Sequence, residues 1–155
     1  MFCLRWAQLC KSRLEANGWE VWLARDGTEK RKPPLATGVK LANEKDAVLL
    51  CLHLNSAANP TADYCLVRYS GQGVQLAACL LAEFRRVTQM PENSHLDQGT
   101  RGQALIRGCR HSAVICEPCF VSHPERAAWL RTPVALIALA GAVCRGLSAY
   151  ERMIP

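Results

Sequence analysis

The sequence lacks the features that mark exported or membrane-spanning chains. No apolar stretch of adequate length precedes Lys11, so no signal peptide is visible. The longest apolar run, residues 133–144, is too short to span a bilayer and predicts a buried helix. No internal repeat or linker divides the chain, so a single domain is predicted over 1–155. We therefore expect a protein made in the cytoplasm, without a membrane span.

A disulfide pattern is also missing, although nine cysteines are many for 155 residues. Their number is odd, which does not suit a closed disulfide framework. Five of them lie in apolar surroundings, namely Cys51, Cys65, Cys79, Cys116 and Cys144. The set favours buried free thiols in a reducing compartment.

A second matched Cys-x-x-Cys pair is absent as well. The single pair, Cys116 and Cys119, lies near Cys109, His111 and His123, a combination that could suggest a zinc knuckle. Structural zinc sites usually need two matched pairs, and Cys116 lies inside an apolar run. A knuckle is therefore disfavoured, and His123 is expected to have a turn role.

The net charge of +6 and the pI of about 9.0 favour anionic partners such as nucleic acid, anionic lipid or acidic wall polymers. The net charge alone does not distinguish among these partners. Lys and Arg are scattered along the chain rather than gathered in a stripe, which argues against nucleic acid as a partner. Half of the residues are apolar, enough for one sizeable core.

Apolar periodicity predicts an alternation of helices and strands, which indicates an α/β layer fold. We expect a central mixed twisted sheet of about five strands with helices on both faces. Ser122 is expected to cap a helix, and residues 88–102 are expected to be the most mobile loop. Predicted helices cover 4–14, 35–43, 74–87 and two segments after Ser122 that divide near Thr132, and predicted strands cover 20–24, 47–54, 64–69 and 112–116.

Two of these segments resemble the zinc-dependent N-acetylmuramoyl-L-alanine amidases, the enzymes that cut the stem peptide from the sugar of peptidoglycan. Residues 40–60 place an Ala-Asn pair and an acidic residue before a buried strand that ends in His53. Residues 112–130 place a buried strand before Glu117, followed by a Phe-x-Ser-His-Pro turn and an acidic helix start. Weaker likeness in residues 18–25, 70–81 and 135–150 follows in the same order, so the resemblance covers nearly the whole chain.

The resemblance implies a zinc-activated water that attacks the amide between N-acetylmuramic acid and L-alanine. It makes His53 a zinc ligand and Glu117 the general base and acid, with Asn55 and Arg107 as substrate-binding candidates. Without the resemblance, His53 would be a hydrogen-bonded structural residue, Glu117 a solvated strand-end carboxylate and Arg107 a surface arginine. His95, in the polar loop, is expected to be solvated.

The sequence departs from this family at its beginning. The family starts with a strand that ends in a Gly-His-Gly turn, whose histidine is the first zinc ligand, and a glutamate at the start of the first helix is the second. This chain begins inside that helix, so two of three protein ligands and the first strand are missing. The true start lies upstream, or the chain is a remnant, for example of a prophage lysis gene, or it has kept binding without catalysis.

Three functions therefore stay open. The leading one is a peptidoglycan amidase acting at the bacterial cell wall, such as a phage-type lysin, with Zn²⁺ as its cofactor. The second is a non-catalytic wall-binding or regulatory protein of the same fold. The third is a small basic protein that binds zinc through thiolates and also binds nucleic acid.

Overall fold

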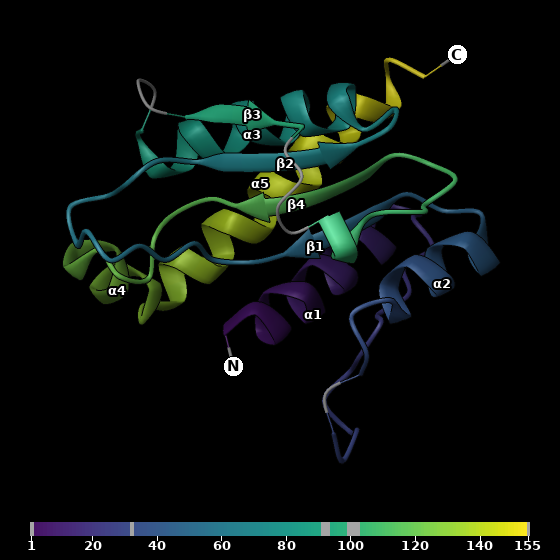
Figure 1. Cartoon of the computed structure of the whole chain (residues 1–155), viewed down its shortest axis with the longest axis horizontal. Coiled ribbons are helices and arrows are strands. Elements are labelled where there is room, and N and C mark those ends of the chain that lie inside the picture. The colour runs from purple at the N-terminus through teal and green to yellow at the C-terminus, as the bar shows by residue number, and fades with distance from the viewer. Residues whose placement is uncertain (1, 32, 91–93, 99–102, 155) are drawn as a thin grey trace.

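The computed structural model describes residues 2–31, 33–90, 94–98 and 103–154 (Figure 1). At its centre, these residues form one four-stranded mixed sheet in the order β1 (Leu49–Leu52), β4 (Ala113–Glu117), β2 (Leu66–Ser70) and β3 (His95–Asp97). β1 runs parallel to β4, β4 antiparallel to β2, and β2 parallel to β3. The α/β prediction is confirmed, with four strands in the described part of the chain where about five were expected.

Helices cover both faces of this sheet (Figure 1). Three helices and the side chains of one strand face form the larger core, while a short helix and a 3-10 turn lie over the other face. The helices are α1 (Phe2–Glu15), α2 (Thr37–Lys45), α3 (Val74–Thr88), α4 (Pro124–Leu130) and α5 (Pro133–Glu151), and the 3-10 turn is η1 (Gln103–Leu105). α1, α3 and α5 form most of the larger core, to which α4 adds Leu130, and α2 and η1 lie on the opposite side.

The larger core follows from the helical periodicity of α1. Trp6, Cys10 and Leu14 are four residues apart, so they share one face of the helix, and all three are buried. The Trp6 ring meets Phe84 of α3 edge-on, with ring centroids 6.0 Å apart. α1 is thereby held against α3 beneath the sheet.

α5 is longer than the apolar run that predicted it. It covers 19 residues and continues beyond residue 144 to Glu151, with a mean hydropathy of 1.5 in its most apolar part. Length and composition alone would allow it to cross a bilayer, but this is weak evidence because core helices share both properties. Here α5 packs against α1 and α3, as a core helix does.

The predicted strand at residues 20–24 was wrong. The segment joins no strand, and the carbonyl of Val21 instead accepts a hydrogen bond of 2.5 Å from the Lys11 ammonium. Val21 and Leu23 are half-buried while Glu20, Trp22 and Ala24 are exposed, so the segment has the burial of a strand without a hydrogen-bonding partner. A strand needs a neighbour, and none of the described strands pairs with this segment.

The loop predicted over residues 88–102 contains β3, which the sequence analysis missed. β3 has only three residues, and it pairs with β2 in the register Leu66 with His95 and Arg68 with Asp97. Three residues carry too little periodicity for a local signal, and the edge of β2 provides the partner. His95 is exposed, as expected, but it begins this strand, and its ring lies against Tyr64 at 5.3 Å between centroids.

Ser122 does not cap α4 as predicted. His123 occupies the N-cap position and makes no side-chain capping bond, so its expected turn role matches its position. The Ser122 hydroxyl instead accepts a hydrogen bond of 3.1 Å from the N–H of Ala57. It thereby ties the turn after β1 to the turn after β4.

Candidate functional site

His53 and Glu117 come together at the carboxyl ends of neighbouring parallel strands. Leu52 of β1 is in register with Cys116 of β4, and the N–H of His53 donates to the Cys116 carbonyl at 2.9 Å. The next residues along both strands, His53 and Glu117, therefore lie side by side at the usual spacing of about 4.8 Å between strands. Paired residues of parallel strands share a face of the sheet, so both side chains start from the same face.

That face is the one covered by α2 and η1. Cys51 and Ile115, two residues before His53 and Glu117, both pack into the smaller core on this side. Leu52 and Cys116, one residue before them, pack into the larger core on the other side. His53 is exposed, whereas the side chain of Glu117 keeps only 15% of its surface exposed. The imidazole is therefore open to solvent, while the carboxylate beside it is largely shielded.

An arginine holds the Glu117 carboxylate. The Nε of Arg68, on β2, donates to Glu117 Oε2 at 3.3 Å, and Arg68 Nη1 donates to Asp97 Oδ2 on β3. The three groups form a row across β4, β2 and β3, with 15–30% of each side chain exposed. Solvent and salt weaken such partly buried ion pairs less than they weaken pairs on the surface. Arg68 therefore orients the Glu117 carboxylate and balances its charge.

The sequence analysis did not find Arg68 or Asp97. Arg68 was read only as part of a strand, and Asp97 as part of a loop. A charged residue between Val67 and Tyr69 in an apolar strand was the one available signal, since such residues are rarely buried without a partner. Its partners lie 29 and 49 residues away in sequence, beyond any local pattern.

Asn55 extends the pairing of the two strands past the site. Its N–H donates to the Cys119 carbonyl at 2.9 Å, and its own carbonyl accepts from Val121 at 2.9 Å. The side-chain oxygen accepts from the N–H of Ser56 at 2.8 Å and so forms the turn. These bonds give Asn55 a structural role two residues from His53, while substrate binding stays a prediction.

Arg107 lies at the other end of β4. It is exposed and follows Ile106, whose carbonyl accepts from the Ser70 hydroxyl, and Ser70 pairs with Ala113. Ala113 and Glu117 are the two ends of β4. From Ala113 the strand runs about 13 Å to Glu117, at 3.3 Å per residue. The structure does not bring Arg107 together with Glu117, and its substrate role stays a prediction.

Few side chains near His53 could bind a metal ion. Within the described ranges, no three His, Cys, Asp or Glu side chains are gathered so that they could hold a metal ion. Burial raises the pKa of both Cys51 and Cys119 to about 12, and it raises the pKa of Cys116 well above its usual value. Metals bind thiolates rather than thiols, so these cysteines are poor ligands at neutral pH. All nine cysteines are free.

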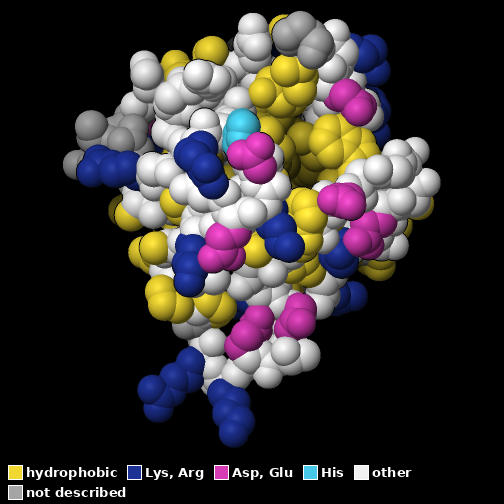
Figure 2. Space-filling view, turned by 90° about the vertical axis from the view of Figure 1, so that its right-hand side faces the viewer, with side chains coloured by type: hydrophobic (Ala, Val, Ile, Leu, Met, Phe, Trp, Pro, Cys, Tyr) yellow, Lys and Arg dark blue, Asp and Glu magenta, His cyan; other side chains and the backbone are white. Residues whose placement is uncertain are grey.

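Basic residues on the face shown in Figure 2 do not gather into one patch. Lys and Arg side chains there alternate with Asp and Glu, and a hollow lined by hydrophobic side chains opens beside them (Figure 2). Nucleic-acid-binding surfaces usually present a continuous basic stripe. The pattern on this face gives no support to a nucleic-acid partner.

Comparison with known proteins gives one consistent family. The profile of the N-acetylmuramoyl-L-alanine amidase family matches residues 1–149. The comparison with curated proteins found no match.

Solved structures of low sequence identity share the fold. The catalytic domain of the amidase CwlV from Bacillus (Paenibacillus) polymyxa var. colistinus has a TM-score of 0.87 and 22% identity, covering 99% of this chain and 84% of that one. Ami1 from Mycobacterium smegmatis has a TM-score of 0.88 and 17% identity over 99% and 76% of the two chains. AmiC2 of Nostoc punctiforme has a TM-score of 0.85 and 19% identity over 97% and 83%.

Proposed function

Because the chain belongs to the N-acetylmuramoyl-L-alanine amidase family, we propose that it recognises peptidoglycan and that its site is built to cleave the amide between N-acetylmuramic acid and L-alanine of the stem peptide. One observation carries the proposal: His53 and Glu117 lie side by side at the carboxyl ends of two neighbouring parallel strands. Binding sites of α/β sheets lie at this end of the strands. The activity would take place at the bacterial cell wall, and a lysis role of phage type stays a prediction.

In this proposal Glu117 moves the proton. A carboxylate beside the scissile amide can take a proton from the attacking water and pass it to the leaving nitrogen, because a free amine anion is too poor a leaving group. Arg68 keeps the carboxylate in one orientation by its 3.3 Å bond to Oε2. Asp97 in turn fixes Arg68 from the far side. Both are positioning residues.

The described residues do not by themselves fit a catalytic zinc site. Such sites use three protein ligands and leave one position for water. Here His53 is the one imidazole at the site, and Glu117 is engaged by Arg68. No third donor joins them in the described ranges. One imidazole holds zinc weakly, so we expect the 155-residue chain to show little zinc-dependent cleavage unless further ligands are supplied.

A second candidate stays open, a protein of the same fold that binds the wall without cleaving it. Its support is the fold and the strand ends that would contact the substrate, both of which are present without a metal site among the described residues. The third candidate, thiolate zinc with nucleic acid, has no support in the described residues, because the cysteines are buried and protonated at neutral pH.

Purified peptidoglycan sacculi distinguish the two candidates. The chain, Glu117→Gln, His53→Ala and the control His111→Ala are compared for sacculus binding and for release of stem peptides, with added zinc and with chelator. His111 is an exposed histidine before the opposite end of β4, bonded to Asp46 at 2.8 Å. Release of peptides with an L-alanine amino terminus is followed by mass spectrometry.

Each outcome of this comparison supports or contradicts one of the two candidate functions. Zinc-dependent release that is lost in Glu117→Gln and His53→Ala but kept in His111→Ala supports the amidase. Binding without release, unchanged in Glu117→Gln, supports the wall-binding protein. Release that survives both chelation and His53→Ala contradicts the role of His53, and the absence of binding and release together contradicts both candidates.

A further inference from the structure

Three charged side chains form a strip that leads from Glu117 toward the edge strand β3. Glu117, Arg68 and Asp97 come from β4, β2 and β3, which are neighbours in the sheet (Figure 1). Arg68 is in register with Asp97 on one side and with Ile115 on the other, and Ile115 is two residues before Glu117. Paired residues share a face of the sheet, and so do residues two apart in a strand. The charged strip therefore lies on the face of the His53 and Glu117 site.

The charged strip is about as long as three peptide residues in extended conformation. β3 lies two strands from β4, which amounts to about 9.6 Å, and Asp97 is offset from Glu117 by two residues along the strand, or about 6.6 Å. The backbones of these two residues are therefore about 12 Å apart. Arg68 bridges the span, because its Nε donates to Glu117 Oε2 at 3.3 Å and its Nη1 donates to Asp97 Oδ2.

Arg68 and Asp97 keep bonding capacity for a ligand. A guanidinium has five N–H donors, and among the described residues Arg68 uses one on Nε and one on Nη1. Asp97 accepts through Oδ2, and no described residue bonds its Oδ1. Their side chains are 21% and 30% exposed, so solvent reaches both groups. The two carboxylates and one guanidinium give the charged strip a net charge of −1, although the whole chain carries +6.

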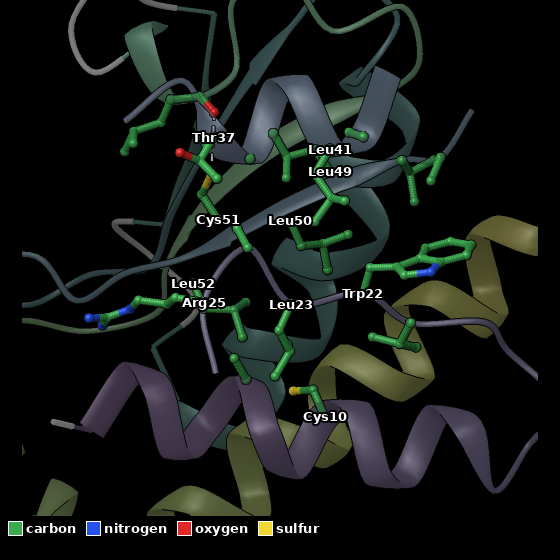
Figure 3. Close-up of a pocket in the computed structure, with 18 of the residues that line it drawn as sticks. Cys10, Trp22, Leu23, Arg25, Thr37, Leu41, Leu49, Leu50, Cys51 and Leu52 are labelled. Carbon is green, nitrogen blue, oxygen red and sulfur yellow. Dashed lines mark hydrogen bonds between the residues drawn. The ribbon is translucent and has the colours of Figure 1, made fainter. Parts of the chain in front are cut away.

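An apolar cavity lies on the other side of the site. It has a volume of about 640 Å³ and follows the outer edge of β1, between α1 and α2 (Figure 3). Leucines such as Leu23, Leu41 and Leu50 form much of its wall, and none of the three residues of the charged strip lines it (Figure 3). Burying a charge among such side chains is costly. A substrate with charged groups therefore gains more from the charged strip than from this cavity.

The stem peptide carries its charges in the order that complements the charged strip. It begins at the scissile amide with L-alanine and continues with D-glutamate, which is linked through its γ-carboxyl group and keeps a free α-carboxylate. A diamino acid with a side-chain amine is a common third residue, whereas the sugars of the glycan are uncharged. At about 3.5 Å per residue, the carboxylate comes before the amine along the 12 Å from Glu117. The carboxylate then meets Arg68, and the amine meets Asp97.

We propose that Arg68 and Asp97 form the subsite for the second and third residues of the stem peptide. Arg68 binds the α-carboxylate of D-glutamate through N–H donors that Glu117 and Asp97 leave unused, and Asp97 binds the amine of the diamino acid through Oδ1. Complementary charges of this kind fix the register of a ligand. The inference rests on the proposed function, because it requires the scissile amide to lie at Glu117.

The test compares three synthetic muropeptides by calorimetry on the 155-residue protein, with chelator present so that no zinc-dependent cleavage occurs. The first is N-acetylmuramoyl-L-alanyl-γ-D-glutamyl-L-lysine amide, the second has its D-glutamate α-carboxylate amidated, and the third has its lysine amine acetylated. Acetylation removes the one positive charge that faces a negative strip, so we expect about tenfold weaker binding. Amidation removes a bond to Arg68 but also relieves repulsion from Glu117 and Asp97, so we expect only about threefold weaker binding.

Protein variants assign each preference to its residue. Asp97→Asn should bind the lysine and acetyl-lysine peptides within about twofold of each other. Arg68→Gln leaves two carboxylates without their guanidinium, so the amidated peptide should bind more tightly than the acid. If Asp97 only positioned Arg68, Asp97→Asn would weaken all three peptides alike and keep the tenfold preference. The matched controls Asp26→Asn and Arg85→Gln, both at exposed positions outside the charged strip, should keep both preferences.

Circular dichroism checks that the variants are folded, and if one is not, the three peptides on the unaltered chain still decide. Equal affinities of the three peptides would overturn the subsite, as would preferences that persist unchanged in both Asp97→Asn and Arg68→Gln. Binding of N-acetylmuramic acid alone as tightly as the first muropeptide would overturn it too. No binding of any muropeptide contradicts the proposed function together with the subsite. Muropeptide binding or sacculus cleavage without any charge preference contradicts the subsite alone.

Discussion

Replacing Gly146 with alanine is expected to destabilise the protein, whereas the same replacement at Gly141 is not. Both glycines lie in α5. A Cβ on Gly146 would lie 2.8 Å from Leu80 Cδ2 and 3.1 Å from Leu80 Cα in α3, closer than packed carbons approach. A Cβ on Gly141 would meet only the guanidinium ends of Arg145 and Arg13, at 3.0 and 3.4 Å, and these long side chains can move.

The magnitude follows from two opposing effects. Alanine is favoured over glycine inside a helix by about 1 kcal/mol, and this gain applies at both positions. Overpacking of a well-packed core costs about 1–3 kcal/mol, and it applies only at Gly146, because Leu80 is fully buried and part of the clash is with its backbone. We expect Gly141→Ala to be neutral or up to about 1 kcal/mol more stable. Gly146→Ala should be about 1–3 kcal/mol less stable than Gly141→Ala.

Urea unfolding followed by circular dichroism measures the free energy of unfolding of both variants. The two values are compared at the same dependence of that free energy on urea concentration. A double-mutant cycle with Leu80→Ala adds a second measurement. If Gly146 and Leu80 clash as inferred, Gly146→Ala should cost less in the Leu80→Ala background than in the original chain. Equal stabilities of Gly146→Ala and Gly141→Ala, together with no coupling to Leu80, would refute the close approach of α3 and α5.

Three further predictions address charge, thiols and a buried hydroxyl. Partial burial acts to raise the pKa of Glu83, but hydrogen bonds from two arginines outweigh it and hold the pKa below its usual value. The stabilisation from the ionised Glu83 is fully present above the pKa that this residue has in the unfolded chain, and it is lost as the pH falls through its lower pKa in the folded protein. Glu83→Gln should therefore reduce the loss of unfolding free energy that acid causes between about pH 5 and 3. Iodoacetamide at neutral pH should leave Cys116 unmodified in the native protein and modify it after denaturation, as peptide mass spectrometry can show, because burial raises the pKa of this thiol. Tyr150→Phe should lower the free energy of unfolding by about 1 kcal/mol, because the Tyr150 hydroxyl lies 2.9 Å from that of buried Ser112; an unchanged value would show that this bond contributes nothing.

Much of the fold could be predicted from local patterns. The apolar run at 47–54 and the run at 112–116 correspond to β1 and β4, and the helix predicted over 74–87 ends within one residue of α3. These elements have either an unbroken apolar run or helical periodicity, both of which are properties of the residues themselves. Segment 20–24 shows the opposite case, since its apolar residues favour a strand that forms only beside a partner strand, which no local pattern reveals.

The site was predictable only in part. His53 and Glu117 stand out because each is a polar residue at the end of an apolar run. The structure places them side by side, but their chemical roles stay predictions. Asn55 was singled out for the substrate, while the structure shows its bonds to Cys119 and Val121.

The sequence by itself determined where the apolar strands end and which polar groups stand at those ends, because apolar runs and side-chain alternation are properties of consecutive residues. Only the tertiary structure decided that Arg68 and Asp97 would join Glu117, and that the outer edge of β1 would face an apolar cavity. Those outcomes depend on the order of strands in the sheet and on hydrogen bonds between distant residues, which no window of neighbouring residues contains.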